Sequence, residues 1–324
     1  MNDNISVSPV KKSKNSKKSK SGRFSGQTVF LIAIMALPVL NWLIFWLYIN
    51  YNSILLAFQN RLGDWILSNF KDVWISLVEP VDYGGSVQLA LKNTLRYFGV
   101  NVLVLLPAGL ILSYFIYKRI FGYKWFRVLF YLPSIVSAVA LTTVYGEFIN
   151  PNGPLGEILK KLGAEVPPEG FLARNDTATD AIIWYSIWAG CGGQILLFGG
   201  AMSRIPPEIM EAAKIDGVSP LREVISFILP LIWPTLSTML IFQLTSFFTS
   251  SGPILLFQPN GDYQTMTISF WIFKQVYGGG LPTASLSSGQ INLISCTGLC
   301  FTVVGMPIIL LVRWLLEKVP TVEY

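Results

Sequence analysis

The sequence predicts an all-α membrane protein with six transmembrane helices and both termini in the cytoplasm. Of its 324 residues, 52% are hydrophobic and only 13% are charged, which is too apolar for an ordinary soluble domain. Six apolar segments are long enough to cross about 30 Å of hydrocarbon as helices. These segments are residues 28–50, 93–117, 126–148, 181–203, 228–250 and 291–315.

A basic tail precedes the first segment, and residues 1–27 are predicted to form a disordered cytoplasmic extension. The tail carries seven positive charges against Asp3, which accounts for the whole formal net charge of +6. Such a Lys/Ser-rich run fixes orientation and contacts anionic lipid headgroups, so we expect membrane lipid and not nucleic acid as its partner. The basic residues are Lys11, Lys12, Lys14, Lys17, Lys18, Lys20 and Arg23.

The first apolar segment is predicted to be a retained anchor helix. A basic stretch followed by an apolar run superficially resembles a secretory signal. This run is too long for the apolar core of a secretory signal, and it ends in Asn50-Tyr51-Asn52 without a cleavage site of small residues. Residues 51–92 then form a loop outside the cell, before the second helix starts at residue 93.

The orientation follows from the positive-inside rule. An even number of spans places both ends on one side, and the clusters of basic residues named below all lie on that side, together with the short tail 317–324. The opposite loops carry mixed or acidic charge, as in residues 157–180. The basic residues are Lys118, Arg119, Lys124 and Arg127 after the second span, Arg204, Lys214 and Arg222 after the fourth, and Arg313 and Lys318 at the end.

Several residues within the spans indicate packing or bending more than ligand binding. Two glycine pairs recur seven residues apart in the fourth span and would let a neighbouring helix approach closely. Prolines inside spans remove backbone hydrogen bonds and favour kinks. The residues concerned are Gly192, Gly193, Gly199 and Gly200, and Pro107, Pro133, Pro234 and Pro307.

The sequence offers no catalytic or metal-binding constellation, and we expect no cofactor on this chain. Histidine is absent, and Cys191, Cys296 and Cys300 all fall in apolar segments, which favours packing over a disulfide, metal or redox role. No P-loop motif is present. Because Glu147 and Arg96 lie near predicted span ends, no intramembrane carboxylate is available for proton coupling. The driving energy is therefore expected from another protein.

A polar element between the fourth and fifth spans, residues 204–230, contains a short helix with a defined start and end. Pro206 and Pro207 suit the first helical position, whereas Gly217 suits the left-handed conformation that ends a helix. Glu208 and Glu211 place negative charge near the helix N-terminus. Ser219 and Pro220 then begin a second helix that continues into the membrane.

The stretch Glu211-Ala212-Ala213, followed by Asp216-Gly217 and Leu229-Pro230, resembles the EAA loop of permease subunits of binding-protein-dependent ABC importers. The family pattern is E-A-A-x-x-x-G followed by an apolar segment and Leu-Pro, and Phe227 replaces its usual isoleucine. The resemblance covers about residues 85–316 and is strongest for the carbohydrate-type branch, similar to the larger maltose-type subunit. Further matching residues are Asn93-Thr94, Tyr131-Leu132-Pro133, Gly252-Pro253, Thr265 and Ala284-Ser285.

The resemblance implies that residues 93–316 form a permease core and that the helix within 204–230 is a coupling helix. In the family this helix lies in a groove of a separate cytoplasmic ATPase, which binds ATP and Mg. Met210, Ala213 and Gly217 share helical spacing and would form a narrow ridge for that groove. The implied ATPase-coupling residues are Glu208, Met210, Glu211, Ala212, Ala213, Lys214, Asp216, Gly217 and Pro230.

The resemblance also implies a sugar or oligosaccharide delivered by an extracellular binding protein, at the interface with a second permease subunit, in a bacterial or archaeal plasma membrane. Aromatic faces stack on sugar rings and uncharged polar groups bond to hydroxyls. Interhelical packing is the alternative role for each candidate. The candidates are Gln243, Thr245, Ser246, Phe247, Phe248, Trp188 and Gln194. Other functional readings are import of a polyol, sugar phosphate or peptide-like compound, a secondary carrier, or a receptor.

Overall fold

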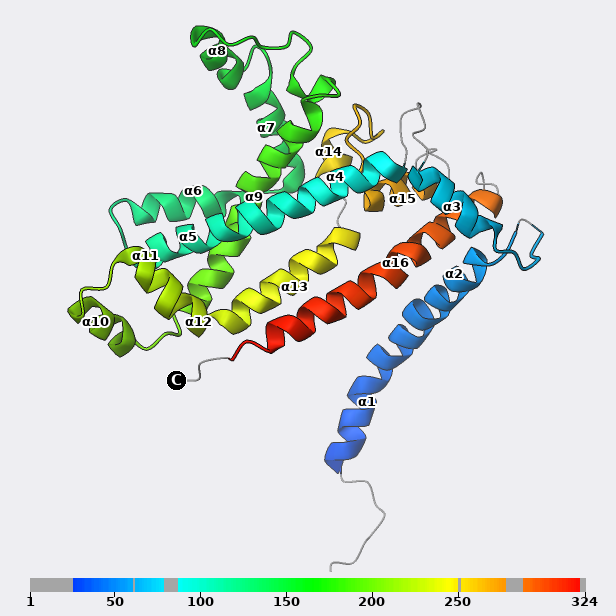
Figure 1. Cartoon of the computed structure of the whole chain (residues 1–324), viewed down its shortest axis with the longest axis horizontal. Helices are drawn as coiled ribbons and strands as arrows, with labels where there is room; N and C mark the ends of the chain where they lie inside the picture. Colours follow the sequence, from blue (N-terminus) through cyan, green and yellow to red (C-terminus); the bar gives the residue numbers. More distant parts are fainter. Residues whose placement is uncertain (1–25, 61, 79–86, 250–251, 278–287, 321–324) are drawn as a thin grey trace, which may run out of the picture. The chain divides into compact units, whose positions relative to one another are not determined.

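A computed structural model describes residues 26–60, 62–78, 87–249, 252–277 and 288–320 of the chain (Figure 1). The basic tail and the Ala284-Ser285 pair lie outside these residues. Within them the regular structure is helical, apart from an isolated bridge between Gln59 and Trp65. The chain divides into two compact units, with the boundary between Asn52 and Ser53.

The first apolar segment forms one helix of 32 residues, Gly26–Ala57, which is longer than the predicted span 28–50. It consists of α1 (Gly26–Asn41), a π-helical turn η1 (Trp42–Tyr48) and α2 (Ile49–Ala57). Trp42 and Trp46 stack at 5.3 Å between ring centroids. The Asn50 and Asn52 side-chain amides donate to backbone carbonyls one turn earlier, so the polar end of the helix satisfies its own donors.

The predicted loop 51–92 is largely helical where the structure describes it. The Asn60 side chain accepts bonds from the Leu62 and Asp64 amides and makes a tight turn. The chain then forms α3 (Ser68–Val78). The buried Asn69 amide donates to the carbonyls of Ala57 and Gln59 at 3.0 and 2.9 Å. Val73 of α3 packs with Cys296 of α16 (Ser288–Glu317), which fixes α3 on the C-terminal helix.

Two long helices form the centre of the second unit. The first runs over Val87–Tyr117 and contains α4 (Val87–Val100), the π-helical turn η2 (Asn101–Leu105) and α5 (Leu106–Tyr117). The second is α9 (Ala178–Met202). A Cβ on Gly109 would lie 2.4 Å from the Gln194 Cβ, so this glycine lets α5 and α9 approach closely. The Ser113 hydroxyl adds a bond to the Ile195 carbonyl at 3.1 Å.

The third and fifth predicted spans are bent helix pairs and not straight helices. The third consists of α6 (Tyr123–Ile135) followed by α7 (Ala138–Ile149) and α8 (Pro154–Lys161), with a bend of 116°. The bend arises because Val136 is extended and Ser137, at φ −55° and ψ 133°, is also not helical. The described residues therefore contain four long apolar helices, or six candidate spans if each bent pair counts as one.

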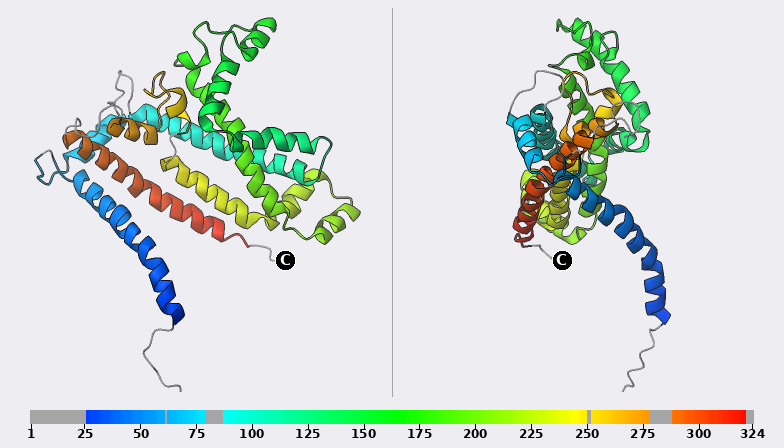
Figure 2. Two further views of the ribbon diagram at one scale, coloured as in Figure 1. Left: turned by 180° about the vertical axis from the view of Figure 1, so that it is seen from behind. Right: turned by 90° about the vertical axis from the view of Figure 1, so that its right-hand side faces the viewer.

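The fifth predicted span is bent by 80°. Its first part comprises α11 (Pro220–Glu223), the π-helical turn η4 (Val224–Ile228) and α12 (Leu229–Leu231), and its second part is α13 (Trp233–Thr249). Ile232 leaves the helical conformation between them, at φ −96° and ψ 8°. Figures 1 and 2 show α13 running beside α16, in which Pro307 does not interrupt the helix.

The glycine pairs of α9 only partly form the predicted packing face. A Cβ on Gly192 would meet the Phe130 carbonyl oxygen at 2.5 Å, so α6 crosses closely there. Gly193, Gly199 and Gly200 have open space around them among the described residues. Spacing identifies glycines on one helix face, but it does not say which of them another helix covers.

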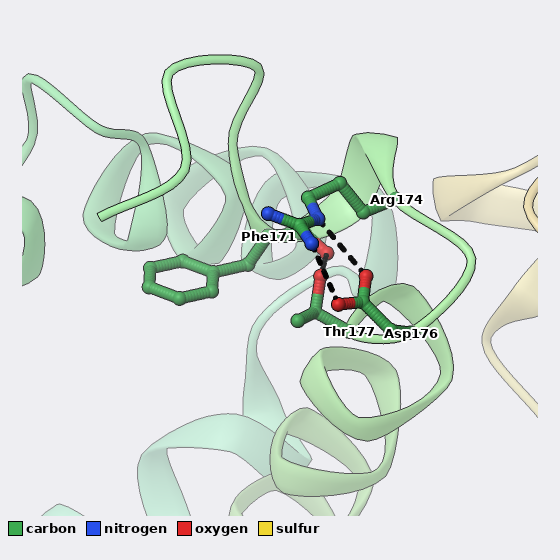
Figure 3. A network of polar contacts seen from close by, with 4 residues as sticks. All are labelled: Phe171, Arg174, Asp176 and Thr177. Carbon is green, nitrogen blue, oxygen red and sulfur yellow. Dashed lines mark hydrogen bonds and ion pairs between the residues drawn. The ribbon is translucent and has the colours of Figure 1, made fainter. Parts of the chain in front are cut away.

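A short segment before α9 is held by its own polar contacts (Figure 3). The Arg174 guanidinium donates twice to the Asp176 carboxylate, at 3.0 and 2.8 Å, and this lowers the pKa of Asp176. The Thr177 hydroxyl donates to the Phe171 carbonyl at 2.7 Å. These bonds close the turn between η3 (Phe171–Ala173) and α9, and thereby fix where α9 begins.

Candidate functional site

The polar element between the fourth and fifth predicted spans contains α10 (Pro207–Ile215), and its ends are built as the sequence predicts. Pro207 occupies the first helical position. Gly217 has φ +67°, and the Gly217 and Val218 amides donate back to the carbonyls of Lys214 and Ala213 at 3.2 and 3.1 Å. This pair of bonds is the Schellman arrangement, which closes a helix through a left-handed residue.

The second predicted helix start is also confirmed. Ser219 precedes α11 in an extended conformation, and Pro220 is the first residue of the helix. The Ser219 side chain makes no capping bond to the helix, although its carbonyl accepts the Glu223 amide at 2.9 Å.

The predicted ridge of Met210, Ala213 and Gly217 differs from what the structure shows on the inner face of α10. Met210 and Ala213 are buried, and Met210 packs in a core cluster with residues of α5, α9 and α13. The spacing correctly places these residues on one face, but that face is covered by the chain itself. They are therefore unavailable to a groove on another protein, whereas Gly217 is exposed.

The outer face of α10 consists of exposed charged and small side chains together with an exposed isoleucine. Ile215, at the end of the helix, is 86% exposed. The predicted coupling set consists of charged and small residues, with Met210 and Pro230, and does not include Ile215. Besides Gly217, the predicted coupling residues that are exposed are Glu208, Glu211, Ala212, Lys214 and Asp216. Pro230 lies in α12, close to the bend at Ile232.

Near the other end of α9, the Asn93 and Thr94 side chains hydrogen-bond to the segment that precedes α15 (Ile268–Tyr277), and we call this set of bonds the clasp. The Asn93 side-chain amide donates to the carbonyls of Gln264 and Met266 at 2.7 and 2.9 Å. The Thr94 hydroxyl accepts the Ile268 amide at 3.0 Å. Gln264 itself has φ +59°, so these bonds hold an uncommon backbone conformation.

Beside this clasp lies a cavity of 390 Å³ between α4, α9, α13 and α14 (Ile254–Phe257). Its polar and aromatic lining consists of uncharged side chains, and the Tyr97 hydroxyl is buried without a hydrogen-bond partner among the described residues. Phe247 meets Phe98 edge to face at 5.5 Å between ring centroids. The lining residues with rings or polar groups are Thr94, Tyr97, Phe98, Asn101, Tyr185, Ser186, Ser246, Phe247 and Thr267.

Only Ser246 and Phe247 of the predicted path residues line this cavity. Gln194 instead packs against Gly109, and the Phe248 ring lies against Gly305 of α16. Trp188 meets the Tyr185 ring at 6.2 Å between centroids. The Thr245 hydroxyl donates to the Ile241 carbonyl within α13, and Gln243 accepts the Ser246 hydroxyl through its backbone carbonyl. Gln194, Phe248 and Trp188 therefore make contacts between or along helices, whereas the Thr245 side chain is exposed.

The cavity also contains residues that the sequence did not single out. These residues lie in helices whose composition predicts membrane spans and nothing more. They are Tyr97, Asn101, Tyr185 and Ser186. Asn101 lies in the π-helical turn between α4 and α5. A polar residue within an apolar span was a usable signal for this position, because such residues commonly mark functional sites.

Comparison with known proteins identifies what this arrangement resembles. Residues 105–319 match the family model described as binding-protein-dependent transport system inner membrane component. The polygalacturonan/rhamnogalacturonan transport system permease protein YteP of Bacillus subtilis is 24% identical over 295 residues, which cover 88% of this chain and 87% of YteP. The lactose transport system permease protein LacF of Rhizobium radiobacter is 26% identical over 78% of this chain and 82% of LacF.

The fold also matches solved structures. A chain of a bacterial ABC transporter that imports the acidic polysaccharide alginate has a TM-score of 0.71 at 23% identity, over 91% of this chain and 98% of that one. The alginate transporter in complex with its pentasaccharide-bound periplasmic protein gives the same TM-score at 24% identity, over 88% of this chain and 93% of that one.

Proposed function

The chain belongs to the family of inner membrane components of binding-protein-dependent transport systems, and from that membership we propose that it forms the translocation path for a sugar or oligosaccharide in an ATP-driven importer. It is a multi-pass membrane protein. A bacterial or archaeal plasma membrane, with both termini and α10 in the cytoplasm, agrees with the distribution of its basic residues.

The cavity between α4, α9 and α13 carries the assignment to sugars. Rings at Tyr97, Phe98 and Phe247 offer faces for stacking, and hydroxyls at Ser186 and Ser246 suit the hydroxyl groups of a sugar. A volume of 390 Å³ falls within the usual range of small-molecule sites, about 300–1,000 Å³. The described residues of this lining include no charged side chain, which favours a neutral sugar over an acidic one.

The partners follow from the family and from α10. The solute arrives on an extracellular binding protein, and a second permease subunit completes the path. An ATPase dimer, which holds ATP and Mg, receives the exposed face of α10 around Glu211 and Ile215. Loaded binding protein and ATP then each favour one arrangement of the spans, so transport is a shift between two populations.

Purification of the whole transporter through a tag on this chain tests the proposal. A P-loop ATPase is expected to co-purify, and the reconstituted complex is expected to take up sugar only with binding protein outside and ATP inside. Uptake by this chain alone, driven by an ion gradient, would instead identify a secondary carrier. In competition, neutral oligosaccharides should displace the transported sugar and uronic-acid oligosaccharides should not.

A further inference from the structure

A buried ion pair connects the segment after α10 to the end of α5. Lys118 directly follows α5, and Glu223 ends α11. The Lys118 Nζ and Glu223 Oε1 atoms are 2.6 Å apart, with 31% of the lysine and 7% of the glutamate side chain exposed. The Tyr114 ring centroid lies 5.9 Å from the Lys118 Nζ atom, so the lysine ammonium also faces an aromatic ring.

This pair differs from the other ion pairs of the described residues. Arg96 with Asp180, Arg174 with Asp176, and Arg313 with Glu317 have both side chains substantially exposed. Exposed pairs contribute little, because water already solvates both charges. A carboxylate as buried as that of Glu223 depends on its partner, because an unpaired charge in that position is strongly unfavourable. The contact therefore holds α11 on α5.

A second connection lies on the other side of the bend at Ile232. The Trp233 indole Nε1 atom donates to the Leu316 carbonyl at 3.2 Å, which ties the start of α13 to the end of α16. Glu223 and Trp233 thus anchor the two arms of the bent helix to different partners. Between them are the π-helical turn η4, Pro230 and the non-helical Ile232, all of which weaken the helix as a rigid rod.

We propose that Lys118 and Glu223 are positioning residues that make α10, α11, α5 and α9 one moving body, with the bend at Ile232 as its hinge against α13 and α16. The inference rests on the proposed function, in which an ATPase displaces α10. The core cluster that joins Met210 of α10 to Leu110 of α5 and Phe198 of α9 gives this body its packing, and Leu236 and Met239 of α13 form the side of the cluster along which the hinge would move. The ion pair then carries the motion across the loop that follows α10.

Neutral variants of each residue test this role in the whole transporter reconstituted into vesicles. Glu223→Gln and Lys118→Met are expected to lower sugar uptake per ATP hydrolysed by about tenfold, within the range of measured coupling free energies. The ATPase subunit should still co-purify, since α10 is untouched. The matched control is Glu317→Gln, which removes an exposed pair at the end of α16 and should keep the wild-type ratio. A wild-type ratio in both test variants would overturn the inference.

A cross-link between the two positions separates lost motion from lost folding. In a chain with Cys191, Cys296 and Cys300 replaced by serine, Lys118→Cys with Glu223→Cys should reproduce the low uptake ratio. A short bifunctional maleimide that joins the two cysteines should restore it, because the proposal requires α11 and α5 to stay together. A cross-linked protein that remains inactive, or an uptake ratio that Cys substitution leaves unchanged, would contradict the inference. If the wild-type chain retains no ATPase, the proposed function itself fails.

Discussion

The Val218 amide donates to the Ala213 carbonyl at 3.1 Å, and this bond closes α10 around the left-handed Gly217. It fixes where α10 ends, and hence where the exposed Ile215 and Asp216 side chains lie. Apart from its chain neighbours, no atom of the described residues lies within 4 Å of a Cβ placed on Gly217, so the backbone conformation and not crowding demands glycine there.

Gly217→Leu is predicted to leave the protein in the membrane but to abolish ATP hydrolysis stimulated by loaded binding protein. A left-handed leucine costs about 1–2 kcal/mol, so the end of α10 should change conformation and the ATPase should lose its docking surface. The measurement is hydrolysis in proteoliposomes, and normal stimulation would contradict the coupling role.

Gly163 provides the matched control. It has φ +78°, with open space around it among the described residues, and it closes α8, with the Ala164 amide donating to the Leu159 carbonyl at 2.9 Å. Gly163→Leu therefore introduces the same strain at an equivalent helix end away from α10. The ATPase is expected to co-purify with Gly163→Leu, and a loss equal to that of Gly217→Leu would indicate general misfolding.

Ile215→Glu is predicted to release the ATPase without unfolding the chain. The side chain is 86% exposed, so it adds little to the core, yet a desolvated contact with a partner would lose its apolar surface. Thermal unfolding of the purified chain should be unchanged, while the amount of co-purified ATPase falls. Leu162→Glu, which changes a leucine 76% exposed beside α8, should affect neither quantity. Retention of the ATPase by Ile215→Glu would show that Ile215 lies outside the docking surface.

Local signals in the sequence predicted α10 well because they depend on neighbouring residues. Pro207 at the first position and Gly217 beyond the last one both act through their own backbone angles. The second, fourth and sixth apolar segments also correspond to single long helices, since hydropathy follows burial in lipid over a full span.

The features that the sequence missed depend on contacts distant in the chain. Hydropathy averages over the bends at Val136 and Ile232, because apolar residues flank both. The spacing of Met210 and Ala213 shows that they share a face, but only the packing of α5 and α9 shows that the face is covered. The clasp between Asn93 and Gln264 joins residues whose separation along the chain gives no signal of contact.

Gly109→Ala is predicted to destabilise the central helix pair. Its added Cβ would lie 2.4 Å from the Gln194 Cβ, and α5 and α9 must separate to relieve the clash. Overpacking of this kind costs about 1–3 kcal/mol, so the midpoint of thermal unfolding in detergent should fall. Gly193→Ala, where space is open, serves as the control and should leave the midpoint near that of the wild type. Equal midpoints for Gly109→Ala and wild type would mean that the two helices do not approach this closely.

Tyr97→Phe is predicted to weaken sugar uptake without altering assembly. Tyr97 lines the cavity, and its buried hydroxyl has no hydrogen-bond partner among the described residues, so a sugar hydroxyl that reaches it would satisfy it. Loss of one such bond costs about 0.5–1.5 kcal/mol, or roughly 2- to 10-fold in the sugar concentration that half-saturates transport. If the hydroxyl instead served only the fold, its removal would relieve an unsatisfied group and raise stability with no change in uptake.

Tyr145→Phe supplies the contrast, because the Tyr145 hydroxyl donates to the Ala181 carbonyl at 2.8 Å outside the cavity lining. That variant should lose stability and keep the wild-type half-saturation, so the two tyrosines separate a contact with the transported sugar from a contact between helices.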